Sequence, residues 1–108
     1  MVTQRPQQNA VFRAIADPTR RRILSLLRGQ RLTVGEIAGH FHTSRPAISK
    51  HLRMLRTAGL VTTRQRGTAH LCALRAAPLR GIAQWLHDYE TLWDESLRRL
   101  KTHIEETP

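Results

Sequence analysis

With 108 residues, of which 40% are hydrophobic and 5% aromatic, the chain can bury one aliphatic core but has too few apolar side chains for two. Its 18 Lys and Arg outnumber its 8 Asp and Glu, and 6 of those acids lie in residues 81–108, so residues 1–80 are a strongly basic body that favours a polyanionic partner. One cysteine excludes an internal disulfide. There is no signal-peptide pattern and no apolar run of membrane length, so we expect a cytoplasmic protein with no membrane partner.

The N-terminal part predicts two short helices. Residues 1–9 are polar, and we expect them to form a flexible leader. From Val11 onward, apolar side chains recur at helical spacing, which predicts a first helix ending near Asp17. Asp is a favoured N-cap and Pro18 is tolerated at the first helical position, so a second helix should follow at once and end near Arg28.

The next two helices predict a helix-turn-helix over residues 33–58. Thr33 and Glu36 have the spacing of a capping box, which starts a short third helix that we expect to end near Phe41. A fourth helix should start within a residue of Ser44. Its apolar positions recur at intervals of four and three, which marks the buried face: Ile48, Leu52 and Leu55.

A β-hairpin and a long helix complete the chain. Two short runs in residues 60–74 flank Gly67 and predict a hairpin, or wing, with this glycine at its tip. Residues 78–105 predict one helix with a coiled-coil-like seam. The order α-α-α-α-β-β-α over residues 10–105 is that of a winged helix-turn-helix, mainly α with a small β-hairpin.

The outward face of the fourth helix is polar and basic, and residues near the start of such a helix read base edges in the major groove. We expect Arg45 and Ser49 to read bases. The hairpin is also basic and should contact DNA, although an ordinary solvated hairpin is the alternative. The predicted DNA-binding residues are Ser44, Arg45, Ser49, Lys50, Arg53, Arg64 and Arg66.

The last helix predicts a homodimer. It is too long for a small domain to cover, so its apolar seam must find a partner, and we expect that partner to be a second copy. The first and last helices would both contribute. The predicted interface residues are Val11, Phe12, Tyr89, Trp93, Leu97 and Leu100.

Three segments resemble one family of bacterial regulators. Residues 16–24, ADPTRRRIL, residues 44–49, SRPAIS, and residues 51–61, HLRMLRTAGLV, are similar to the ArsR/SmtB winged-helix regulators. The resemblance covers about residues 10–105 and implies a homodimer, formed by the first and last helices, that binds an imperfect inverted repeat in operator DNA. It also implies roles in DNA reading for five residues: Ser44, Arg45, Ser49, Lys50 and, on the wing, Arg66.

Many members of that family sense metals, but this chain lacks the corresponding ligands. The thiolate pair in the third helix would fall on Thr33 and Gly35, and neither can supply a thiolate. The zinc and nickel positions of the last helix would fall on Ala76, Pro78, Tyr89 and Leu92. The resemblance is therefore closest to members without these sites, and we expect no cofactor. An effector or partner protein stays open.

The sequence supports three hypotheses. The first is a sequence-specific transcriptional regulator, expected to be a repressor that binds double-stranded DNA as a homodimer. The second is a nickel- or zinc-responsive regulator that uses non-standard ligands, with His40, His42, His87, His103 and Glu106 as candidates. The third is a nucleoid or RNA-binding protein without sequence preference. Hydrolase, P-loop and metalloprotease motifs are absent from the sequence, so we expect no enzyme.

Overall fold

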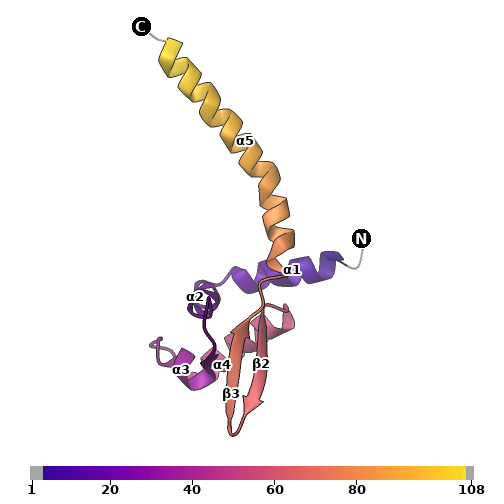
Figure 1. Ribbon diagram of the computed structural model, residues 1–108, viewed down its shortest axis with the longest axis vertical. Coiled ribbons are helices and arrows are strands. Elements are labelled where there is room, and N and C mark those ends of the chain that lie inside the picture. The colour runs from indigo at the N-terminus through magenta and orange to yellow at the C-terminus, as the bar shows by residue number, and fades with distance from the viewer. Residues whose placement is uncertain (1–3, 107–108) are drawn as a thin grey trace.

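The computed structural model describes residues 4–106 as a small helical body from which one long helix projects (Figure 1). The body carries a small sheet on one side. The body and the projecting helix together extend 68 × 36 × 22 Å along the principal axes. No helix within these residues is both long and apolar enough to cross a membrane. The elements in chain order are α1 (Gln4–Ile15), α2 (Pro18–Leu26), β1 (Leu32–Thr33), α3 (Val34–Ala38), α4 (Arg45–Thr57), β2 (Val61–Arg66), β3 (Ala69–Leu74) and α5 (Leu79–Glu106).

The first helix is longer than the sequence predicts. α1 begins at Gln4, so residues 4–9 are helical where a flexible leader was expected, and residues 1–3 lie outside the described part of the chain. Pro6 falls in the first turn, where its missing N–H breaks no helical bond. The Gln8 side chain lies against α5, where a Cβ built on Gly81 would be 2.8 Å from its Nε2. Contact between α1 and α5 therefore begins before the apolar stretch of α1.

Three helices start at caps that the sequence predicts. The side chains of Asp17 and Ser44 accept from the backbone N–H groups of Arg20 and Ala47. Thr33 and Glu36 form the full capping box, in which Glu36 accepts from the Thr33 N–H at 2.9 Å. That hydrogen bond holds the pKa of Glu36 below its usual value. α3 nevertheless ends at Ala38 rather than near Phe41, and the chain continues in tight turns.

The sheet has three strands in the order β1-β3-β2, all antiparallel, rather than the two expected. β1 has only two residues, too few to show the alternation that marks a strand in sequence. The hairpin turn is tight, because Arg66 pairs with Ala69 across Gly67 and Thr68. Gly67 has φ +63°, which a tight hairpin turn needs and glycine supplies without strain.

The core lies between α1, α2, α3, α4 and the inner face of the sheet. It includes the predicted α4 face, with Ile48, Leu52 and Leu55 almost fully buried. Cys72 of β3 is also buried there, and this burial raises the pKa of its thiol. α5 contributes only Ile82 as a buried residue, so most of its length lies outside the core.

Asp17 makes the free energy of unfolding depend on pH in the acid range. The N–H of Arg20 donates to its carboxylate at 3.0 Å, and this bond lowers the pKa of Asp17 from its usual value of 3.8. A lowered pKa in the folded state stabilises the fold above pH 3.8, and this stability is lost as pH falls through the folded-state pKa. Asp17→Ala should therefore lower the free energy of unfolding by about 0.5–2 kcal/mol at pH 7. The difference between the two proteins should shrink below pH 3.8.

Urea denaturation of wild type and variant at several pH values measures this difference. Asp17→Asn is the control, since Asn caps a helix about equally well but does not titrate. An Asp17→Ala deficit that stays constant down to acid pH would contradict the assignment.

Candidate nucleic-acid interface

The recognition surface is built on α4. Because Ile48, Leu52 and Leu55 fix one face of this helix in the core, the other face is set toward solvent. All five predicted residues at the start and along the outer face of this helix are exposed: Ser44, Arg45, Ser49, Lys50 and Arg53. The structure therefore brings together the polar and basic side chains that the sequence assigned to DNA.

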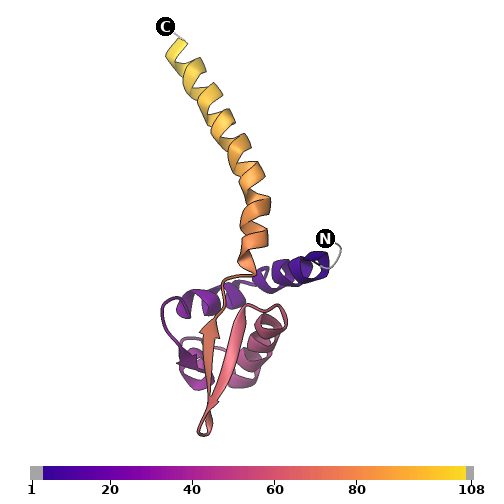
Figure 2. The same cartoon turned by 45° about the vertical axis from the view of Figure 1, so that its right-hand side comes forward.

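The wing supplies a second basic element. Arg64 and Arg66 lie on β2, and both are exposed. The hairpin tip points away from the free end of α5 and lies in the same half of the molecule as α3 and α4, in both views (Figures 1 and 2). No Asp or Glu occurs between residues 37 and 80, so the recognition helix and the wing carry basic charge that no local acid neutralises.

Arg45 lies at the junction of the two helices of the helix-turn-helix. The atoms of its guanidinium are 3.9 Å from the position of a Cβ built on Gly35, so the side chain passes close to the start of α3. It stays exposed in this position. A side chain at position 35 would make only ordinary van der Waals contact with Arg45, so the glycine is not required to make room for it.

A polar network that the sequence analysis missed holds α4 to the α1–α2 junction. Arg20 donates from Nε to the Ala14 carbonyl at 2.7 Å and from Nη2 to the Arg13 carbonyl at 3.0 Å. Its Nη1 lies 3.3 Å from Nδ1 of His51, which must accept because a guanidinium only donates. Asp17 Oδ2 lies 3.9 Å from the same ring nitrogen. The hydrogen bond between Arg20 and His51 therefore links the middle of the recognition helix to the α1–α2 junction.

One signal in the sequence could have revealed this network. Basic side chains in the first turn of a helix oppose its macrodipole, yet α2 has Arg20 and Arg21 there. The structure gives the reason: Arg21 Nη1 donates to the carbonyls of Ile15 and Ala16 at 2.8 and 3.1 Å. The two arginines satisfy the carbonyls that the end of α1 leaves open.

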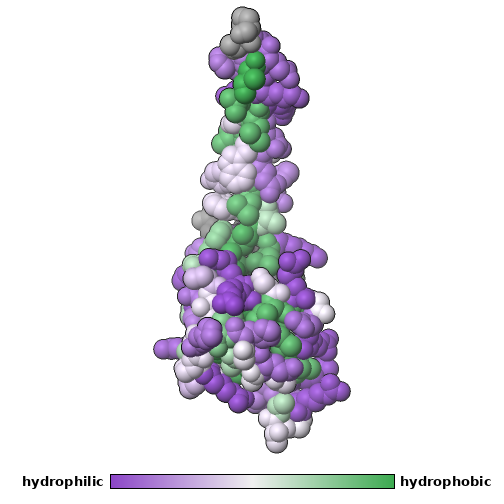
Figure 3. Space-filling model, turned by 90° about the vertical axis from the view of Figure 1, so that its left-hand side faces the viewer, coloured by the Kyte–Doolittle hydropathy of each residue, from purple (hydrophilic) through white to green (hydrophobic). Residues whose placement is uncertain are grey.

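The apolar side of α5 is exposed along almost the whole helix (Figure 3). Phe12 of α1 contacts the N-terminal part of α5, where the Phe12 and Trp85 rings pack edge to face with centroids 5.4 Å apart. Val11, in contrast, is fully buried within its own chain, so a partner cannot contact it. The expected interface must therefore be corrected at this residue. The exposed large apolar residues of α5 are Trp85, Tyr89, Leu92, Trp93, Leu97, Leu100 and Ile104.

The metal-ligand candidates are dispersed. His40 and His42 are exposed in the turns after α3, and His87 lies on α5, far along the chain from His103 and Glu106. Among residues 4–106, no three His, Cys, Asp or Glu side chains come close enough together to hold one ion. A single chain therefore offers no assembled metal centre in its described part.

The helical core, the helix-turn-helix with an outward basic helix, and the basic wing together define a winged helix-turn-helix DNA-binding protein. Residues 17–63 match the model of the arsR family of bacterial regulatory proteins. The chain belongs to this family and is a transcriptional regulator.

Individual proteins of known function or structure support this assignment. The transcriptional repressor SdpR of Bacillus subtilis is 39% identical over 89 residues, which cover 82% of this chain and 99% of that protein. An ArsR-like transcriptional regulator from Rhodococcus superposes with a TM-score of 0.68 at 31% identity, covering 95% of this chain and 96% of the other. A homodimeric winged helix-turn-helix DNA-binding domain from Mycobacterium bovis superposes with a TM-score of 0.65 at 26% identity, covering 91% and 88%.

Proposed function

We propose that this regulator acts in the cytoplasm as a homodimer that binds an inverted-repeat operator and represses transcription. One observation carries the proposal. Exposed basic side chains on α4 and on the wing lie in the same half of the molecule, and residues 37–80 contain no Asp or Glu. In this arrangement α4 enters the major groove and the wing follows the backbone or the minor groove. Repression is favoured by the similarity to SdpR, itself a transcriptional repressor.

The dimer follows from the specificity that such a protein needs. One short recognition helix reads too few base pairs, so two copies must act on two half-sites. The exposed apolar side of α5 offers a self-complementary surface, and Phe12 extends it onto α1. The acidic residues of α5 keep phosphate away from this helix, so that both basic faces of the dimer meet the same DNA.

Selection from a random duplex library tests the proposal. We expect an enriched palindrome, bound at least about 1,000-fold more tightly than random duplex, which is the low end for specific regulators. Structured RNA should compete no better than random duplex. Equal affinity for all three nucleic acids would instead favour a nucleoid or RNA-binding protein.

Arg66 should contact the phosphate backbone. Arg66→Ala is expected to weaken binding to the selected palindrome and to random duplex by similar factors, because a phosphate contact carries no sequence information. It should also reduce the slope of log affinity against log salt by about 0.9 for each phosphate that is no longer neutralised. Fluorescence anisotropy across a salt series measures both. Arg66→Lys is the control, since it keeps the charge, and an unchanged slope in Arg66→Ala would remove this residue from the backbone contacts.

Metal should be dispensable, because Thr33, Gly35, Ala76 and Pro78 occupy family ligand positions without being ligands for zinc or nickel. Chelator treatment should leave both folding and DNA affinity unchanged. Equilibrium dialysis with nickel and zinc checks the same point. A stoichiometric isotherm in the submicromolar range that alters DNA affinity would establish the metal-responsive alternative.

A further inference from the structure

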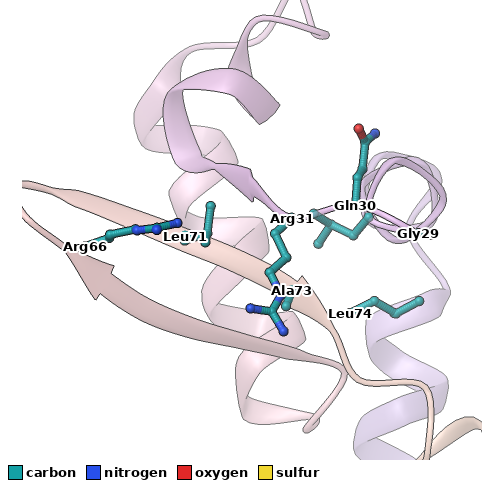
Figure 4. Close-up of a pocket in the computed structure, with 8 residues that line it drawn as sticks. Gly29, Gln30, Arg31, Arg66, Leu71, Ala73 and Leu74 are labelled. Carbon is teal, nitrogen blue, oxygen red and sulfur yellow. The ribbon is translucent and has the colours of Figure 1, made fainter.

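The outer face of the sheet carries a groove that shares Arg66 with the proposed DNA-binding surface and extends beyond it to residues with no assigned role. It has a volume of about 630 Å³ and lies between the α2–β1 loop and strand β3 (Figure 4). Arg31, just before β1, stands on one side and lies across Ala73 of β3 in this view, and Arg66 of β2 stands on the other side, with Leu71 of β3 between the two arginines. The strand order β1-β3-β2 produces this arrangement, because it places β3 between β2, which bears Arg66, and β1, which Arg31 directly precedes.

The chemistry of the groove is that of an amphipathic site. Leu71, Ala73 and Leu74, which are half-buried, provide the accessible apolar part of the lining, Leu27 lies buried behind them, and Gln30 adds an amide. A second hollow of about 290 Å³ shares Arg31, Leu71 and Ala73 and adds Arg64. Three arginines therefore line the two hollows, which share Leu71 and Ala73.

These guanidinium groups have no internal counter-ion. No acidic side chain lines either hollow, and within residues 4–106 none forms an ion pair with Arg31, Arg64 or Arg66. Arginine is suited to bind carboxylate, sulfonate or phosphate groups through two parallel hydrogen bonds. The lining and the charge together select an occupant that has both an apolar body and an anionic head.

We propose that this groove binds a small organic anion, with its acidic group between Arg31 and Arg66 and its hydrocarbon or aromatic body against Leu71 and Ala73. The groove volume is in the range of small-molecule sites. A DNA backbone would use the arginines but would gain nothing from the leucine lining. A free ligand is thus favoured over a continuation of the DNA surface.

Such a ligand would act as an effector. Arg66 belongs both to the groove and to the proposed backbone contact, so ligand and DNA would compete for one guanidinium, and binding of the anion would lower operator affinity. This regulatory consequence rests on the proposed function. Binding of the anion to the groove does not rest on the proposed function, and it can be measured without DNA.

The first experiment titrates the free protein with 1-naphthoate and follows backbone amide shifts by NMR. We expect saturable shifts centred on residues 29–31 and 71–74. The neutral 1-naphthylmethanol and inorganic phosphate should each bind at least tenfold more weakly, because each lacks one half of the ligand chemistry. Arg31→Gln and, separately, Ala73→Glu should weaken naphthoate binding at least tenfold, whereas Arg98→Gln on α5 should not. Circular dichroism verifies that each variant is folded.

Several results would overturn the site: no saturation, equal affinity for phosphate or for the alcohol, shifts centred on α5, or an Arg31→Gln variant that binds naphthoate as wild type does. The second experiment adds naphthoate to the complex with the selected palindrome. It should release wild-type protein but not Arg31→Gln, which should bind the DNA within twofold of wild type without ligand. If Arg31→Gln alone loses DNA affinity as Arg66→Ala does, the groove is a track for DNA phosphates and the small-anion proposal is wrong. Failure to enrich any palindrome would refute the proposed function but leave the NMR result standing.

Discussion

Replacing Leu97 with Asp should convert the homodimer to monomers and remove operator binding at concentrations where wild type is saturated. Leu97 is 63% exposed in the single chain and lies on the apolar side of α5. In a twofold interface both copies would bury the new carboxylate, and an unpaired buried charge costs several kcal/mol. Trp93→Ala should act in the same direction with a smaller effect, because it removes apolar area from the interface. Base preference in any residual binding should not change.

Sedimentation velocity and fluorescence anisotropy, measured on the same samples, test this coupling of assembly to DNA binding. Thr91→Asp is the matched control, because it introduces the same charge in the same helix on the opposite side. Its dimerisation and DNA affinity should stay near those of wild type. The dimer argument would fail if wild type were monomeric at micromolar concentration, or if monomeric Leu97→Asp bound the operator at full affinity.

Replacing Arg45 with Ala should lower the free energy of specific binding by about 1–3 kcal/mol and relax the preference at one base pair in each half-site. Arg45 is exposed at the first turn of α4, the part of a recognition helix that meets base edges. Its guanidinium can pair with the O6 and N7 atoms of guanine. Random duplex should be affected much less, since the base contact does not form there.

Competition against operators substituted at each position locates the base pair that Arg45 reads. Arg98→Ala, which removes the same charge from α5, should leave both affinity and preference unchanged. Equal losses on the palindrome and on random duplex would assign Arg45 to the backbone instead.

Local sequence signals predicted most of the fold because local chemistry determines it. The caps at Asp17, Thr33 and Ser44 are formed by residues within three positions of one another, so their spacing is visible in the chain. The periodicity of α4 and α5 is equally local. β1 was missed because a two-residue strand depends on its distant partner β3, and the first turns of α1 were missed because residues 4–9 lack the apolar periodicity that marks a helix in sequence.

In the candidate site, too, local features could be predicted from the sequence and contacts between distant residues could not. The exposed residues of α4 could be predicted once its buried face was known, because the polar residues of an amphipathic helix lie opposite its apolar face. The link between Arg20 and His51 spans 31 positions in the chain and could not be predicted from periodicity. Val11 illustrates the opposite error: its apolar character is compatible with a core or an interface, and only tertiary packing decides between the two.

Because α5 projects from the body, the stability of the folded state should also depend on protein concentration. The radius of gyration is 18.9 Å, whereas a compact domain of this length would have about 13 Å, and the excess reflects the projecting α5, whose apolar side the single chain leaves in water. If a second copy covers that surface, association contributes to the stability of the folded state, and the melting temperature must rise with protein concentration. The cellular abundance of such a regulator would then set both how much operator is occupied and how much of the protein is folded.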